Sequence, residues 1–266
     1  MNLITSSQNP VIKEAKALKE KKSREEKRLF FIEGLRFVEE ALKEDAEIKN
    51  VILSEKFLQI KGADLLLDKI EKAGLNTSYV TNKLFGEITD TENPQGVMAV
   101  VGMRDAGIEA VIKEKSFVLV LDSLQDPGNM GTIIRTADAA GVTGIILSKG
   151  CVDVYNPKVL RSTMGSIFHL PLYFADSLVE AISFLKSRGI RILASHLKGE
   201  ANYFQLNLTD SLAVVVGNEA KGIGEETVQL ADSLVKIPMP GRAESLNASV
   251  AAGLLLYEVV RQRVLA

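Results

Sequence analysis

The sequence predicts an α/β protein of two domains, the second built on a parallel β-sheet. From residue 117 onward, near-continuous apolar runs alternate with helical stretches, as in sheets that helices cover on both faces. Three of these runs are followed by a loop containing glycine and then by a helix. A polar stretch at 105–115 interrupts the apolar pattern, and 266 residues suit two modest domains.

The first domain is predicted at residues 1–104 and the linker at 105–115. Residues 9–28 form a charged helix in this prediction, and 34–42 and 63–72 are also helical. Strands are expected at 29–32, 48–53, 77–80 and 97–101, the last after an Asn-Pro-Gln-Gly turn signal.

The second domain is predicted at residues 116–266. Its strands are expected at 117–121, 144–147, 190–194, 212–216 and 234–237, with a shorter apolar run at 168–173 as a sixth. Helices are expected at 130–140, 157–164, 177–187, 225–231 and 245–264. Ligands of parallel sheets bind beyond the carboxyl ends of the strands, so the glycine-bearing loops should meet at that edge.

Composition excludes several classes of site. A single cysteine, Cys151, excludes a disulfide framework, and only two histidines, His169 and His196, argue against a metal centre. No apolar run approaches the roughly 20 residues of a membrane span, and the N-terminus lacks a signal-peptide core. We therefore expect a cytoplasmic protein without membrane or metal.

The charge is unevenly distributed. The whole chain carries −2, but residues 1–28 hold eight lysines and arginines against four glutamates, a net +4 that leaves −6 for the rest. A local basic segment can attract the phosphates of a nucleic acid. The alternative is a solvated helix face with pairs of opposite charge four residues apart.

The loop after 117–121 has the pattern of an anion site. Asp126-Pro-Gly-Asn129 is a turn signal, and Asn129 is predicted to cap the helix that follows. Arg135 lies between Gly131 and Ala139 on one stripe of that helix, where a planar anion could meet a single guanidinium. The alternative is a surface ion pair between Arg135 and Asp138.

Two further loops carry polar residues at helix starts. Glu219, in Gly217-Asn-Glu, is either an ordinary acidic residue entering a helix or a site residue that could hold a ribose hydroxyl, Asn129 or Arg135. Ile237 and Leu246 flank a Pro/Gly loop and could hold an adenine ring, or could simply pack the loop, as could Met239. The chain has neither a Gly-x-Gly-x-x-Gly nor a Walker A sequence, which argues against dinucleotides and triphosphates.

These three segments, in this order, closely resemble the motifs of the SpoU (TrmH-type) branch of the SPOUT RNA 2′-O-ribose methyltransferases. The resemblance covers roughly 116–260 and depends on Asn129 with Arg135, Gly-Asn-Glu at 217–219, and Ser-Leu-Asn-Ala-Ser at 245–249. A weaker match at 30–42 and 93–100 resembles the small α/β, L30e-like substrate-binding domain that often precedes this catalytic domain.

The resemblance implies a site, a cofactor and an assembly. Its catalytic residues would be Arg135, Asn129, Glu219, Ser245 and Asn247. Its S-adenosylmethionine site would comprise Ser195, Gly217, Ile237, Met239, Leu246 and Asn247. It further implies a deep trefoil knot and a homodimer. We expect Arg135 to bind a phosphate beside the target ribose, because a guanidinium holds its proton too tightly to be a good base.

The expected function is S-adenosylmethionine-dependent 2′-O-ribose methylation of RNA, with 23S ribosomal RNA the first expectation. The separate substrate-binding domain favours ribosomal RNA only by analogy. Transfer RNA as substrate, and a non-catalytic RNA-binding protein that kept the fold, are the alternatives. We expect neither Arg135 nor Asn247 to support the fold.

Overall fold

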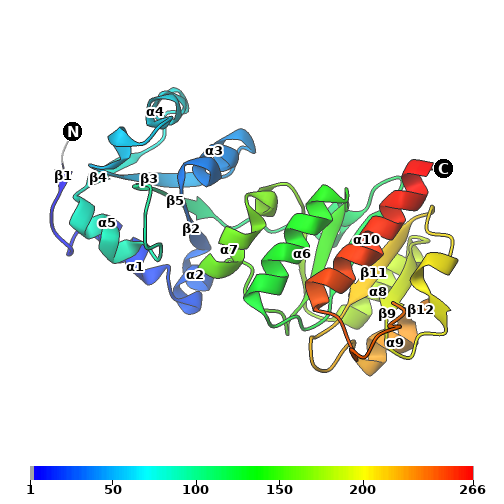
Figure 1. Ribbon diagram of the computed structural model, residues 1–266. Helices are drawn as coiled ribbons and strands as arrows, with labels where there is room; N and C mark the ends of the chain where they lie inside the picture. The colour runs from blue at the N-terminus through cyan, green and yellow to red at the C-terminus, as the bar shows by residue number, and fades with distance from the viewer. Residues whose placement is uncertain (1–2, 266) are drawn as a thin grey trace. The chain divides into compact units, whose positions relative to one another are not determined.

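The computed structural model describes residues 3–265 and divides the chain into two compact units (Figure 1). The first comprises the residues up to Arg104 together with Tyr155–Phe168. The second comprises Asp105–Val154 and the residues from His169 onward. Within the described residues, no helix is both long and apolar enough to cross a membrane.

The first unit contains a mixed five-stranded sheet in the order β1-β4-β3-β5-β2. Strands β1 (Leu3–Ile4), β4 (Thr77–Val80) and β3 (Ile48–Ser54) are parallel, while β5 (Val97–Gly102) runs antiparallel to β3 and to β2 (Leu29–Glu33). Its helices are α1 (Pro10–Ala17), α2 (Lys21–Lys27), α3 (Leu35–Lys43), α4 (Ala63–Lys72), α5 (Asn82–Ile88) and α7 (Pro157–Thr163), with 3-10 turns η1 (Phe57–Gln59) and η3 (Ser166–Phe168).

The single charged helix expected over 9–28 is wrong, because two helices occupy this region. Helix α1 ends at Ala17, and α2 starts at Lys21. The buried Arg24 side chain explains the break: it donates hydrogen bonds to the carbonyl oxygens of Leu18 (2.8 Å) and Lys19 (2.7 Å). Carbonyls at the end of a helix lack intrahelical partners, and the guanidinium supplies them.

The second unit is built on a seven-stranded sheet in which every pairing is parallel, in the order β10-β12-β9-β11-β6-β7-β8. The strands are β6 (Phe117–Leu121), β7 (Gly144–Ser148), β8 (Leu172–Ala175), β9 (Arg191–Ser195), β10 (Ala201–Asn202), β11 (Leu212–Val216) and β12 (Ser233–Lys236). The expected α/β class and parallel sheet are confirmed. The expected strand at 168–173 begins only at Leu172, because Phe168 belongs to a 3-10 turn.

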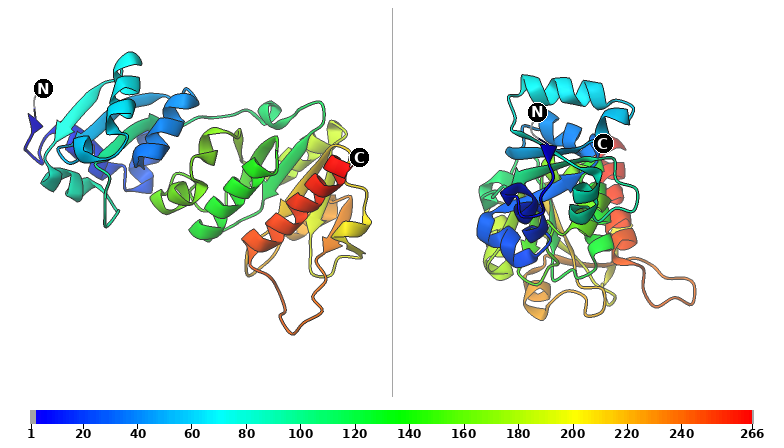
Figure 2. Two further views of the ribbon diagram at one scale, coloured as in Figure 1. Left: turned by 45° about the horizontal axis from the view of Figure 1, so that its top comes forward. Right: turned by 90° about the vertical axis from the view of Figure 1, so that its left-hand side faces the viewer.

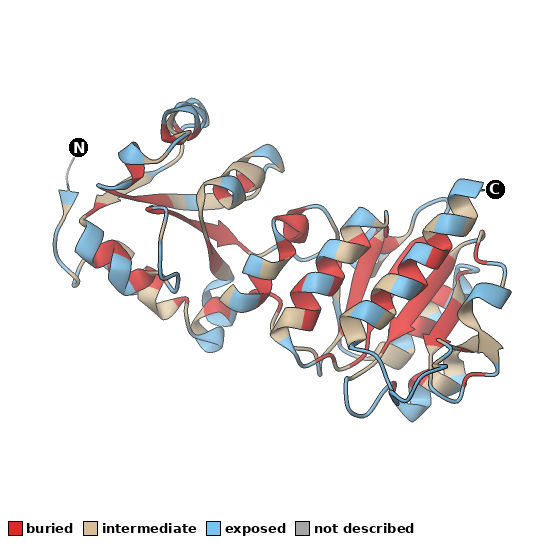
Figure 3. Ribbon diagram, in the orientation of Figure 1, coloured by how far each residue is buried: buried red, intermediate tan, exposed pale blue. Residues whose placement is uncertain are grey.

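Helices cover both faces of this sheet. Helices α6 (Pro127–Ala139) and α10 (Ala248–Leu265) pack side by side on one face, and α8 (Leu178–Ser187) with α9 (Glu225–Leu230) cover the other (Figures 1 and 3). Two 3-10 turns, η2 (Ile108–Val111) and η4 (Tyr203–Gln205), complete the unit.

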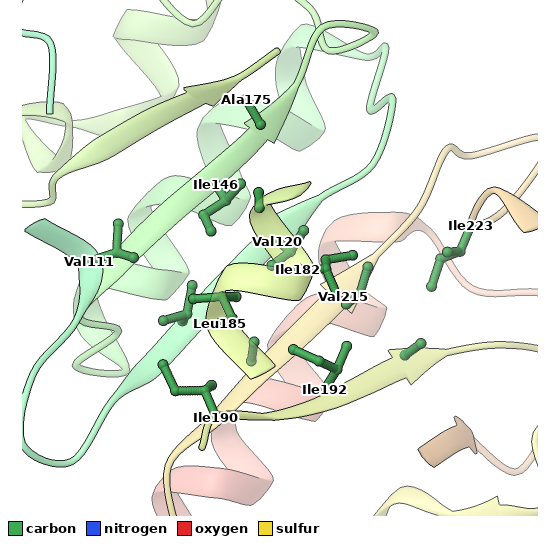
Figure 4. Close-up of a cluster of buried hydrophobic side chains, with 14 residues drawn as sticks. Val111, Val120, Ile146, Ala175, Ile182, Leu185, Ile190, Ile192, Val215 and Ile223 are labelled. Carbon is green, nitrogen blue, oxygen red and sulfur yellow. The ribbon is translucent and has the colours of Figure 1, made fainter. Parts of the chain in front are cut away.

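The alternation of side chains along the central strands divides the core into two layers. Val118 and Val120 of β6 and Val215 of β11 join Ile182 and Leu185 of α8 in one buried cluster (Figure 4). The neighbouring strand residues point to the opposite face and are also buried, which is why these strands read as continuous apolar runs. The core thereby fixes the register of the strands whose loops form the site.

Candidate active site

Three loops that are far apart in sequence meet at the carboxyl edge of the sheet, after β6, β11 and β12. Their contact is a chain of side chains, Glu219, Asn129 and Asn247, which we call the polar relay. Asn129 Nδ2 donates to Glu219 Oε1 at 3.0 Å, and Asn247 Nδ2 donates to Asn129 Oδ1 at 2.8 Å. Asn129 is only 8% exposed, so neighbouring protein groups fix its orientation.

The expectation that Asn129 caps α6 is wrong. The cap is Asp126, whose Oδ1 accepts a hydrogen bond from the Asn129 amide at 2.7 Å, and Pro127 occupies the first helical position. Asn129 therefore lies inside the first turn. Because its side chain is not needed as a cap, it can bridge the other two motifs.

Glu219 is held ionised by hydrogen-bond donors. Burial acts to raise the pKa of this carboxyl, but hydrogen bonds from Asn129 and from the amides of Asp126 (3.0 Å) and Gln125 (3.2 Å) outweigh burial and lower it. Glu219 thus joins the loop after β11 to the loop after β6. The view of it as an ordinary acidic residue entering a helix does not account for these contacts.

Asn247 has a structural task as well as its place in the relay. Its Oδ1 accepts hydrogen bonds from the amides of Ser249 (2.9 Å) and Val250 (3.4 Å) and from the Ser249 hydroxyl (2.6 Å). This is the geometry of a helix N-cap, and it starts α10 at Ala248 instead of the expected 245. The expectation that Asn247 does not support the fold is therefore wrong.

Arg135 is exposed on α6, the helix that packs against α10. The alternative of an ion pair with Asp138 is not realised, since Asp138 Oδ2 lies 2.7 Å from His169 Nδ1. Within residues 3–265, no hydrogen bond or ion pair is made by the Arg135 guanidinium. Its side chain is therefore available to a ligand.

Gly217 begins the loop after β11, where the chain folds back on itself. A Cβ added there would lie 2.3 Å from the carbonyl carbon of Gly222, and Asn218 and Gly222 exchange two backbone hydrogen bonds of 2.9 Å. The glycine is required by this backbone contact, whereas the sequence had suggested contact with a ligand. Ser195 ends the neighbouring strand β9 and is half-buried.

The loop 237–247 between β12 and α10 is exposed over most of its length and extends away from the sheet (Figures 2 and 3). Ile237 and Met239 are half-buried, while Ser245 and Leu246 are exposed. Within the described residues, no backbone-to-backbone hydrogen bond involves positions 238–246. Amides and carbonyls of this loop are therefore free to bind a ligand with both polar and apolar parts.

Sequence reasoning missed the residues that hold the loops in place. Asn218 Nδ2 donates to the Ser123 carbonyl at 2.8 Å, and its Oδ1 accepts from the amides of Ala220 (2.9 Å) and Lys221 (3.0 Å). The buried Asp122 accepts from the Gly224 amide at 2.9 Å. The available signal was an Asp directly after one apolar strand and an Asn two residues after another, where side chains often bind the backbone of a turn.

This arrangement is that of an enzyme with a parallel α/β fold, in which side chains from three loops orient reactants for the transfer of a chemical group. The polar relay and the available arginine supply positioned charge and hydrogen bonds. The chain belongs to the SpoU rRNA Methylase family, whose model matches residues 116–257. A second model, the MRM3-like substrate binding domain, matches residues 9–99.

Individual relatives agree with this assignment. The 23S rRNA (guanosine(2553)-2′-O)-methyltransferase RlmP of Bacillus subtilis is 35% identical over 97% of this chain and 99% of its own. The crystal structure of an AdoMet-bound rRNA methyltransferase from Sinorhizobium meliloti has a TM-score of 0.88 at 34% identity, covering 98% of this chain and 97% of that one. AviRb from Streptomyces viridochromogenes, a SpoU methyltransferase in complex with AdoMet, has a TM-score of 0.87 at 29% identity, covering 97% and 100%.

Proposed function

We propose that this protein transfers a methyl group from S-adenosylmethionine to a ribose 2′-hydroxyl of 23S ribosomal RNA. The observation that carries the proposal is the polar relay of Glu219, Asn129 and Asn247, together with Arg135 on the same helix as Asn129. The Arg135 guanidinium makes no hydrogen bond or ion pair within residues 3–265. Family membership and the RlmP relative support the reaction and the RNA class. A ribosomal RNA substrate implies that the enzyme acts in the cytoplasm.

The methyl donor fits the loops after β9, β11 and β12. The apolar side chains of Ile237, Met239 and Leu246 would contact the adenine of the methyl donor. Backbone groups at Gly217 and in 237–247 would bind its polar edges, and Ser195 would lie at the edge of the donor site. Asn247 would hold the end of this loop against α6. When bound, the donor supplies an activated methyl group on a sulfonium, so catalysis depends chiefly on orientation.

The chain's own residues would orient the acceptor. Arg135 would bind the phosphate next to the target ribose through two N–H groups of its planar guanidinium. Ser245 and Asn247 would position the ribose. Glu219 already accepts hydrogen bonds from three groups, which suits it to fix Asn129 better than to take a proton. A guanidinium is a poor proton acceptor, so Arg135 would stabilise the charge that develops on the 2′-oxygen while water takes up the hydroxyl proton.

We assign RNA recognition to the first domain, with residues 1–104 as the substrate domain, 105–115 as linker and 116–266 as the methyltransferase domain. The MRM3-like match supports this division. The basic segment contributes less than its sequence suggests. Several of its cations are paired, Lys16 with Glu87 (2.6 Å), Lys19 with Asp90 (2.7 Å) and Lys27 with Glu14 (3.1 Å). These contacts favour the alternative of a solvated, ion-paired face.

We further propose a homodimer that uses α10. Val250, Leu254 and Tyr257 lie at helical spacing on α10 and are 50%, 38% and 49% exposed. Leu246, 37% exposed, extends this stripe into the loop that precedes the helix. An apolar stripe beside the helix that carries Arg135 suits an interface that also shields the site. The deep trefoil knot expected from the resemblance stays a prediction.

Comparing 2′-O-methyl positions in ribosomal and transfer RNA from cells with and without the protein tests this function. One ribose in 23S rRNA should lose its methyl group, and the purified protein should restore it from labelled S-adenosylmethionine. Calorimetry should detect binding of the methyl donor by the full-length protein. A methyl group lost only from transfer RNA would overturn the substrate, and no transfer to any RNA would overturn the reaction.

A further inference from the structure

A cavity of about 530 Å³ opens on the carboxyl edge of the second unit, and the residues that line it are different from those assigned to the methyl donor. It is lined by residues that follow three adjacent strands, β7, β6 and β11, and this size lies in the usual range for small-ligand sites, about 300–1,000 Å³. Its lining residues include Asp122, Ser123, Gln125, Asn218 and Lys221. None of them belongs to the catalytic or donor sets.

The strand order places this cavity and the donor loops on opposite sides of β11. The donor loops follow β12, β9 and β11, whereas the cavity follows β11, β6 and β7. The polar relay lies between them, since Glu219 follows β11 and Asn129 follows β6. A ligand in the cavity can therefore be bound at the same time as the methyl donor.

The cavity begins at the polar relay itself. Asn218 lines the cavity and directly precedes Glu219, and the amide of Gln125, another lining residue, donates to the Glu219 carboxylate. The side chain of Gln125 donates to the Gly150 carbonyl on the far wall. An RNA strand with its reactive ribose at the relay would place a neighbouring nucleotide within reach of this cavity.

The walls are preformed and suit a nucleotide. Ser123 adopts a left-handed conformation (φ 59°) that is held by two hydrogen bonds of 2.8 Å, to Ser148 Oγ and from Asn218 Nδ2. Gly150, Gly222 and Gly224 contribute wall without side chains. A wall held rigid before binding loses little entropy when a ligand enters.

The charges in the cavity favour an anion. The one lining carboxylate, Asp122, is 8% exposed and already accepts hydrogen bonds from the Gly224 amide (2.9 Å) and the Ser123 hydroxyl (3.1 Å). Lys221 is exposed at the rim, and its ammonium makes no hydrogen bond or ion pair within residues 3–265. A phosphate bound at Lys221 would therefore contact an unpaired ammonium group, while the charge of the Asp122 carboxylate is already compensated by its two hydrogen bonds.

We propose that this cavity binds a nucleotide of the substrate RNA next to the methylated one, with its phosphate at Lys221. The assignment rests on the proposed function, because it takes the ligand to be the same RNA strand. It gives the methyltransferase domain its own contribution to RNA positioning, separate from the first domain. Lys221 is then a positioning residue that contacts RNA and leaves donor binding unchanged.

The test compares Lys221→Glu with Lys115→Glu in the full-length protein. Lys115 is also exposed but lies two residues before the start of β6, at the opposite edge of the sheet, so it controls for net charge. Filter binding to a 23S rRNA transcript should show a loss of roughly tenfold or more for Lys221→Glu, against less than twofold for Lys115→Glu, with a shallower salt dependence. Lys221→Arg should restore binding, and the Kd for S-adenosylmethionine should be unchanged in all variants.

Equal RNA affinity in Lys221→Glu and Lys115→Glu would overturn the cavity proposal. So would a loss of donor affinity in Lys221→Glu, because that would place the cavity in the donor site. Filter binding requires no chemistry, so this outcome is independent of methyl transfer. A wild-type protein that binds RNA but transfers no methyl group would overturn the proposed function and leave the comparison of the two lysines to decide the cavity.

Discussion

Asn247 donates a hydrogen bond of 2.8 Å to Asn129 across 118 residues of sequence, joining the last motif of the chain to the first. Asn129 in turn donates a hydrogen bond to Glu219, so the buried side-chain amide of Asn129 sets the relative positions of three loops. A network of this kind is strong when every member is satisfied and costly when one is removed.

Asn129→Ala should therefore lower both stability and activity. Removal of the buried amide leaves Glu219 without one donor and Asn247 without its acceptor, at a cost of about 1–3 kcal/mol in the free energy of unfolding. Methyl transfer should fall about a hundredfold or more as the loops lose register. A small shift is enough for this loss, because misplacement of a reacting group by about 1 Å can cost about a hundredfold in rate. Thr132→Ala, an exposed change on the same helix, should alter neither quantity.

Asn247→Asp separates the two tasks of Asn247. Aspartate is as good an N-cap as asparagine, so α10 should keep its start, and the free energy of unfolding should fall only by the cost of leaving the buried Asn129 oxygen unpaired, about 1–3 kcal/mol. A carboxylate cannot donate to Asn129 Oδ1, so methyl transfer should fall. Asn247→Ala should lose the cap as well, at a further cost of about 0.5–2 kcal/mol. Equal activity in Asn247→Asp and wild type would show that the link to Asn129 is dispensable.

The sequence predicted the second domain well because its apolar strands carry the information locally. All five principal strands of the parallel sheet lie within a residue or two of their expected positions. Its errors were at helix starts, where capping decides the boundary, and at the short strand expected over 168–173, which begins only at Leu172. Asp126 and Asn129 are both good caps, and they are distinguished by Pro127, which suits the first helical position after Asp126, and by the part that Asn129 takes in the relay.

Contacts over long sequence distances lay outside what the sequence could show. The sequence suggested Asn129 as one possible partner of Glu219, but it gave no sign of the hydrogen bond from Asn247 to Asn129. Gly217 was given a ligand-facing role, and its contact with the Gly222 backbone became visible only in the folded loop. The break after α1 likewise depends on a contact that the sequence does not show, the hydrogen bond from the Arg24 guanidinium to the Leu18 carbonyl.

Arg135→Ala should leave stability within about 0.5 kcal/mol of the wild type, since the exposed side chain makes no contact that folding needs. Methyl transfer should fall about a hundredfold or more. Arg135→Lys keeps the charge but loses the planar fork, so it should restore little activity. Arg188→Ala removes an exposed arginine at the end of α8 and serves as the control. Near-normal turnover in Arg135→Lys would exclude a role that depends on the fork.

Gly217→Ala should destabilise the loop after β11 far more than Gly241→Ala does the loop after β12. The added Cβ at 217 would lie 2.3 Å from the Gly222 backbone, which cannot move without breaking the paired hydrogen bonds of Asn218. At Gly241 nothing lies within 4 Å of the added atom. Thermal unfolding of both variants, with calorimetry of donor binding, measures the difference. A similar thermal midpoint for the two variants would count against this explanation of Gly217.

Glu219 should make stability depend on pH at the acidic end of the range. Its pKa is lowered in the folded protein, where burial is outweighed by hydrogen bonds from Asn129 and two backbone amides. Its contribution to stability is therefore fully present above its unfolded pKa of about 4.3 and is lost as the pH falls through the lower folded value. Thermal midpoints measured from pH 7 to pH 3 should fall less steeply in Glu219→Gln than in the wild type. Glu226→Gln, an exposed change in the first turn of α9, should retain the wild-type profile. An identical acid limb in Glu219→Gln and the wild type would mean that the relay does not hold this carboxylate ionised.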